Sequence, residues 1–219
     1  SAEAGTRAVL LDTLPMNVMG ALEVTKALTA DMPADAIGGQ MNVISPSAYD
    51  RSERTLHGSI SSNYSDLTEN FTPIAHLTFG NVFGDKQQFG ALVSISYDER
   101  DFGSDNVEAD EWFPDGSGFF TPDDTIEFRE YDLTRERIGI TSNFEYKPDD
   151  NNRYHLRALY GSFTDHEYRH RTSVAGDWSA ASQDNGTVTN TETEVTMKDR
   201  EETQMNWTLS LGGENKIDE

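Results

Sequence analysis

Apolar and polar residues alternate with a period of two over most of the chain after about residue 55. The clearest run covers residues 89–97, where an aliphatic or aromatic side chain occupies every odd position. Side chains of a β-strand point alternately to its two faces, so each such run predicts a strand with one apolar face. About six strands are predicted in this way, at residues 56–64, 71–79, 89–97, 137–146, 153–160 and 205–212.

Residues 1–50 have a different texture, because they are the part densest in aliphatic residues and nearly free of aromatic ones. They are interpreted as a small mixed α/β unit with strands near residues 21–24 and 41–44. Gly38 and Gly39 predict a tight turn before the second of these strands, since glycine tolerates the backbone angles that such turns need. The chain is therefore expected to divide near residue 50.

Short and long connections are expected to alternate between the predicted strands of residues 51–219. The short ones are expected at residues 84–88, at 147–152 and from 212 onward, and the long ones at 103–125 and 172–200. On the long-loop side, only the first connection, near residues 65–70, is short. This alternation is typical of outer-membrane barrels, which have short turns on one rim and long loops on the other.

The direction of the apolar faces separates two interpretations of these strands. In a soluble sandwich the apolar face forms the core, whereas in a membrane barrel it meets lipid and the polar face lines the lumen. Phe89 and Tyr97 bracket their strand, and the eight steps between them at ~3.3 Å each span roughly 26 Å. That length is comparable to an apolar band of about 25 Å with aromatic girdles. We therefore expect Phe89, Ala91, Val93, Ile95 and Tyr97 to face lipid, and Ser94, Ser96 and Asp98 to face the lumen.

Composition narrows the range of functions. The 219 residues carry a formal net charge of −22, which would repel a phosphate backbone, so no nucleic-acid partner is expected. There is no cysteine, which excludes disulfides and thiolate metal sites. No nucleophile with a base and an orienting group is visible, so the chain is not expected to be an enzyme or to need a cofactor. His166 and His170 would lie ~13 Å apart on a strand, too far for a metal site from this pair alone.

Residues 101–124 combine many carboxylates with aromatic side chains, a composition that suits sugar binding by ring stacking and hydrogen bonding. A calcium site and a solvated loop with locally packed aromatics remain open as alternatives; the residue spacing does not match an EF-hand. The candidate ligand-binding residues are Trp112, Phe113, Phe119, Phe120, Trp178 and Arg169.

Residues 21–44 resemble the C-terminal part of the plug domain of TonB-dependent outer-membrane receptors. The shared pattern is a strand ending in Glu23-Val24, then Lys26 and, after a short loop, Gly38-Gly39 before a strand containing Asn42. Ala27 departs from this pattern, because many members have glycine there. The Ala-Leu-Thr stretch that begins at residue 27 is instead similar to the subgroup named after Caulobacter and Xanthomonas.

This resemblance implies a fragment of a receptor for energy-coupled nutrient import across the bacterial outer membrane. Residues 1–50 would be the end of the plug, and 51–219 the first strands of an antiparallel transmembrane β-barrel that has about 22 strands in the family. The implied partners are outer-membrane lipid, a small nutrient and TonB, which would contact a segment outside this chain. Acidic loops and exposed aromatics favour a glycan over a ferric siderophore as the nutrient. The alternative is a soluble acidic β-sandwich that acts as a carbohydrate-binding or adhesive module.

Overall fold

The computed structural model describes residues 19–27, 29, 39–51, 53–109, 111–114, 118–182 and 185–216. These residues are mainly β, and every strand pairing among them is antiparallel, as the alternation predicts. The mixed α/β unit expected at residues 1–50 shows no α-helix among the residues that the structure describes. Within the described part of residues 1–50, the structure has a two-stranded hairpin and a single 3-10 turn, η3 (Ala48–Asp50).

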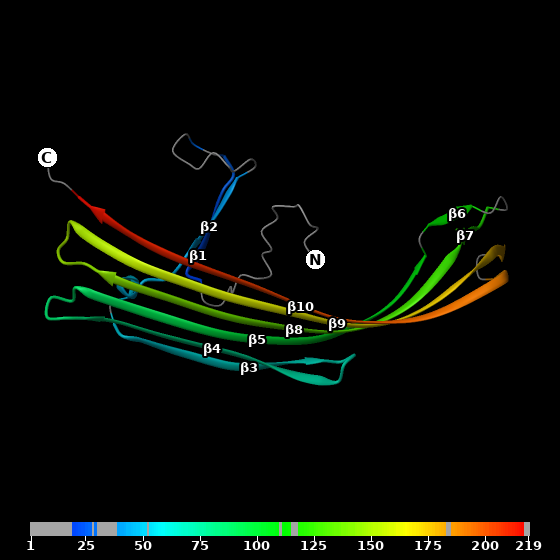
Figure 1. Cartoon of the computed structure of the whole chain (residues 1–219), viewed down its shortest axis with the longest axis horizontal. Coiled ribbons are helices and arrows are strands. Elements are labelled where there is room, and N and C mark those ends of the chain that lie inside the picture. Colours follow the sequence, from blue (N-terminus) through cyan, green and yellow to red (C-terminus); the bar gives the residue numbers. More distant parts are fainter. Residues whose placement is uncertain are drawn as a thin grey trace.

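Six strands form one open antiparallel sheet, as the sequence predicts, and two further short strands after residue 55 pair with each other apart from it. Each strand pairs with its neighbour along this meander, in the order β10-β9-β8-β5-β4-β3. Figure 1 shows that the sheet is curved along its strands, with the hairpin β1–β2 on its concave side. The strands are β3 (Thr55–Ser65), β4 (Asn70–Phe83), β5 (Phe89–Ala109), β8 (Thr125–Tyr146), β9 (Asn152–Ser182) and β10 (Asn185–Asn215).

The two strands expected before residue 50 form the hairpin of β1 (Ala21–Thr25) and β2 (Gln40–Ile44). Gly39 begins the return strand with a φ of 143°, and a Cβ at this position would lie 2.7 Å from the carbonyl oxygen of Thr25. Gly39 therefore occupies a position that favours glycine, while the tight turn predicted with Gly38 involves residues outside the described ones.

The long connection predicted at residues 172–200 is wrong, because almost all of these residues continue β9 and β10, whereas the one predicted at 103–125 is present but shortened to residues 110–124. β5 runs to Ala109, and β9 and β10 are each 31 residues long with only two residues between them. In these extensions polar residues occupy both faces, so hydrophobic periodicity does not mark them. Ion pairs and β-branched pairs across neighbouring strands stabilise them instead.

The ends of the sheet agree with the predicted topology even though the loop lengths do not. The tight turns at residues 84–88 and 147–151 lie at one end, as Figure 1 shows. The four-residue turn at 66–69 and the β5–β8 connection lie toward the other end, and this connection holds β6 (Trp112–Pro114) and β7 (Phe120–Pro122). The third turn expected from Gly212 is wrong, because β10 continues through it to Asn215.

Burial along β5 is inverted relative to a soluble sheet. Leu92, Ser94, Ser96 and Asp98 are buried, whereas Ile95 on the apolar face is 46% exposed. The two faces therefore divide as the sequence predicts, and the polar face is the covered one.

Candidate functional site

One face of the sheet carries a continuous apolar surface, here called the apolar belt. The cross-strand register aligns Phe89, Ala91, Val93, Ile95 and Tyr97 with residues of the other five strands on the same face. Many of these neighbours are large and exposed, with Ile60 at 88%, Leu211 at 81% and Trp207 at 78%. The other large members of the belt are Leu56, Leu77, Phe79, Ile138, Ile140, Phe144, Leu156 and Leu209.

Aromatic residues border the apolar belt near the tight turns. Phe83, Phe89, Tyr146 and Tyr154 stack in succession across four strands, with ring centroids 5.7, 5.0 and 6.3 Å apart. At the other border, the Tyr97 hydroxyl donates to the Glu99 carboxylate at 2.6 Å. The belt thus has an aromatic edge on one side and changes to acidic residues on the other.

Beyond Tyr97 the same face becomes acidic. The structure describes all six strands, and none of their arginines or lysines lies on this face. His166 hydrogen-bonds Asp199 at 2.7 Å, and this bond raises the pKa of His166. His170 approaches Glu130 at 4.0 Å. The exposed carboxylates of this region include Asp132, Asp199 and Glu201.

The opposite face, here called the polar face, carries every arginine of the six strands. Several form ion pairs across neighbouring strands: Arg171 contacts Glu127 at 2.9 Å and Glu194 at 3.1 Å. The arginines share this face because the register aligns each of them, directly or across the intervening strands, with an even-numbered residue of β5. The even-numbered residues of β5 lie on the polar face. These arginines are Arg100, Arg129, Arg135, Arg137, Arg153, Arg157, Arg169, Arg171 and Arg200.

The polar face also holds the segment that leads from β2 to β3. The buried hydroxyl of Ser47 hydrogen-bonds the carboxylate of Glu145, and Arg153 pairs with the same carboxylate. The Asn143 amide donates to the carbonyl of Pro46 at 3.0 Å. This cluster, here called the joint, fixes the linker against β8 and β9 near the tight turns.

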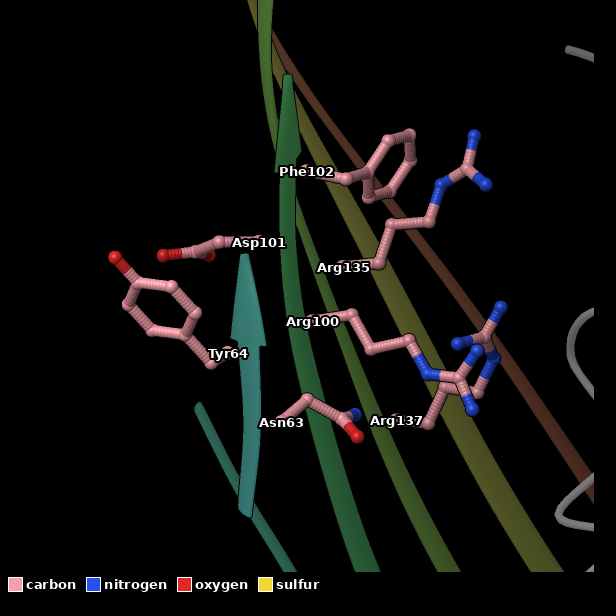
Figure 2. Close-up of a pocket in the computed structure, with 7 residues that line it drawn as sticks. All are labelled: Asn63, Tyr64, Arg100, Asp101, Phe102, Arg135 and Arg137. Carbon is pink, nitrogen blue, oxygen red and sulfur yellow. The ribbon is translucent and has the colours of Figure 1, made fainter. Parts of the chain in front are cut away.

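A cleft of about 520 Å³ lies where β3 ends while β5 and β8 continue. Figure 2 shows the side chains of Arg100, Arg135, Arg137 and Phe102 on one side of the strands. Tyr64 and Asp101, which also line the cleft, point the other way. Asn63 completes the lining. This group is called the arginine cleft below.

The ligand-binding residues predicted from the sequence are only partly brought together. Trp112, Phe113 and Phe120 lie exposed on the β6–β7 hairpin, and Phe119 immediately precedes β7. The indole N–H of Trp178 donates to the carbonyl of Asp124, which follows β7, at 2.8 Å.

Arg169 stands apart from this aromatic group. It is nine residues from Trp178 on the same strand, roughly 30 Å away if the strand is regular. Its guanidinium lies 5.8 Å from the ring centroid of Tyr131 on the polar face. Sequence reasoning missed Arg100, Arg135 and Arg137, although alternate positions such as 135 and 137 necessarily share a face of a strand.

No described group of His, Asp and Glu residues could hold a metal ion. Among the described residues, no helix has the length and apolarity to cross a bilayer. Comparison of the chain with family models, with curated proteins and with solved structures finds no match.

Proposed function

We propose that this chain forms part of the barrel wall and plug of a TonB-dependent receptor in the bacterial outer membrane, where it serves nutrient import. The observation that supports this most strongly is that the apolar belt is exposed, while along β5 the polar face opposite the belt is buried. A soluble sheet has the reverse arrangement, with apolar side chains in the core.

Because the belt is large, its contact with water is energetically unfavourable. Burying one large aliphatic or aromatic side chain contributes about 1.5–3 kcal/mol, and the belt leaves Ile60, Trp207 and Leu211 almost fully exposed. Contiguous apolar surfaces of this extent mark a protein or membrane partner. From Phe89 to Tyr97 the belt is ~26 Å long, close to the band of about 25 Å that bilayer-spanning barrels present.

The aromatic edge supports the same assignment. The stacked rings from Phe83 to Tyr154 lie at one border of the belt, where barrel proteins place girdles at the lipid headgroups. Beyond the other border the same strands continue as polar structure, in the way that barrel walls extend above the membrane.

The hairpin and the joint support a plug inside the lumen. The β1–β2 hairpin lies on the concave side of the sheet, and the following linker is held on the polar face by Glu145 and Arg153. The strands of a closed barrel would place this face inside. The segment that contacts TonB would lie outside this chain, as the resemblance of residues 21–44 implies.

For the nutrient we propose a glycan in preference to a ferric siderophore. The exposed rings of Trp112 and Phe120 project from the same side of the β6–β7 hairpin, since Trp112 pairs with Pro122 and Phe120 with Pro114. Such rings offer flat apolar surfaces to sugars. A soluble β-sandwich remains less supported, because none of the described strands forms a second sheet over the belt.

Spin labels on single cysteines test the membrane assignment, using a chain that has no cysteine of its own. In the complete receptor reconstituted in phospholipid vesicles, labels at Ile95→Cys and Leu209→Cys should collide mainly with oxygen, which concentrates in lipid. A label at Met197→Cys, on the same face beyond the belt, should collide mainly with a water-soluble nickel chelate. Nickel access at Ile95 and Leu209 equal to that at Met197 would contradict the proposal.

A further inference from the structure

We propose that the arginine cleft binds the carboxylate or phosphate group of a small ligand. The proposal deepens the import function above, because it gives the nutrient an anionic group. It rests on Arg100, Arg135 and Arg137, for which the sequence analysis had no role.

The register gathers these three guanidinium groups. Arg100 of β5 pairs directly with Arg135 of β8, and Arg137 lies two residues along the same strand on the same face. Paired residues on neighbouring strands have their Cβ atoms about 4.5–5.5 Å apart. Two arginines placed opposite each other repel, and an anion that bridges their guanidinium groups relieves this repulsion.

Carboxylates near the cleft are shared among the arginines. One oxygen of Asp98 contacts both Arg100, at 3.4 Å, and Arg137, at 3.3 Å. Asp165 contacts Arg135 at 2.7 Å and also Arg200 at 3.0 Å. The Arg100 side chain is 58% exposed, so its guanidinium is accessible to a ligand.

Two arginines of the polar face outside the cleft, Arg129 and Arg171, each contact two carboxylates. Arg129 pairs with Glu108 and Glu127, and Arg171 pairs with Glu127 and Glu194. Three carboxylates thus contact two arginines there, whereas one oxygen of Asp98 contacts both Arg100 and Arg137 of the cleft. The cleft gathers three guanidinium groups in a chain whose formal net charge is −22.

Aromatic rings hold two of the guanidinium planes in place. Arg135 lies 4.8 Å from the ring centroid of Phe102, and Arg137 lies 4.9 Å from that of Phe163. A fixed planar guanidinium can donate two parallel hydrogen bonds to a carboxylate or phosphate, which lysine cannot do. The cleft volume of about 520 Å³ is within the usual range of small-molecule sites and would accommodate a sugar.

Calorimetric titration of the complete receptor in detergent tests the proposal with three probes that share a sugar ring. These are glucose, glucuronate and glucose 6-phosphate, so the neutral sugar controls for ring contacts and the other two separate a carboxylate from a phosphate. We expect the charged probes to bind at least about tenfold more tightly than glucose, with an affinity that falls as salt is added.

Arg100→Gln and Arg135→Gln should each weaken the charged probes about tenfold or more and leave glucose unchanged. Arg54→Gln, which removes one exposed arginine before β3, is the matched charge control and should have no effect. Arg100→Lys keeps the charge without the planar fork and should recover only part of the affinity. Equal binding of all three probes, or unchanged binding in both glutamine variants, would overturn the proposal. The spin-label result is independent, so loss of anion binding with a lipid-exposed belt would refute this site alone.

Discussion

Replacing Leu209 with arginine tests what the apolar belt faces. Leu209 is 62% exposed on β10 and aligns through Ala158 and Ser142 with Val93, the middle row of the belt. If the belt faces water, this substitution puts a charged residue on a solvated surface. If the belt faces lipid, it puts a guanidinium near the centre of the bilayer.

Lipid and water predict different costs of Leu209→Arg in free energy of unfolding. Val93 lies four residues from each border, ~13 Å along the strand and about 10 Å in depth for a strand tilted by about 40°. Arginine at the bilayer midplane costs about 2–4 kcal/mol, roughly a 30- to 800-fold change in the unfolding equilibrium. On a solvated surface the same substitution should change the free energy of unfolding by less than about 0.5 kcal/mol.

Met197→Arg is the matched control. Met197 lies on the same strand and face with a similar exposure of 65%, but twelve residues away in the polar extension. Guanidinium unfolding of the complete receptor in phospholipid vesicles, followed by tryptophan fluorescence, measures both variants. We expect a loss of about 2–4 kcal/mol for Leu209→Arg and little change for Met197→Arg. Costs that agree within about 0.5 kcal/mol would refute the lipid-facing assignment and favour a soluble sheet.

Three further predictions concern other parts of the fold. Arg153→Met should lower the free energy of unfolding by about 3–5 kcal/mol, because it leaves the buried Glu145 carboxylate without its cation; adding Glu145→Gln should restore much of the loss in denaturant titrations. The bond to Asp199 raises the pKa of His166, so the stability it contributes should be complete below about pH 6.5 and be lost as the pH rises through the raised folded-state pKa. Melting temperatures across pH 5–9 should lose this step in Asp199→Asn, and an unchanged profile would contradict the coupling. Gly39→Ala should cost roughly 1–3 kcal/mol and speed hydrogen exchange in β1, since its Cβ would meet a backbone oxygen at 2.7 Å; unchanged exchange rates would show that the turn relaxes.

Hydrophobic alternation was sufficient to predict the strands of the belt, because one face of each is consistently apolar. The same signal failed in the outer halves of β9 and β10. There, Lys198 pairs with Glu167 at 3.1 Å, and Arg171 donates a hydrogen bond to Thr196 at 2.9 Å across the strands. Interactions of this kind depend on register, which a single strand's sequence does not contain. Polar strands therefore had the same composition as loops, and their length could not be predicted.

The site was harder to predict than the fold, because it depends on where neighbouring strands end. The β3–β4 turn brings Asn70 to the Asp101 side chain, and β3 stops at Ser65 while β5 and β8 continue beyond it. The arginine cleft opens at this step, so a short turn in one hairpin determines the exposure of Arg100 on another strand. Aromatic residues in a long connection are visible in the sequence and drew attention to the β6–β7 hairpin. Arginines inside strands gain a common function only when pairing places Arg100 opposite Arg135. If the β3–β4 hairpin were two residues longer on each strand, it would cover the cleft, and binding of charged sugars should be lost while the belt remains unchanged.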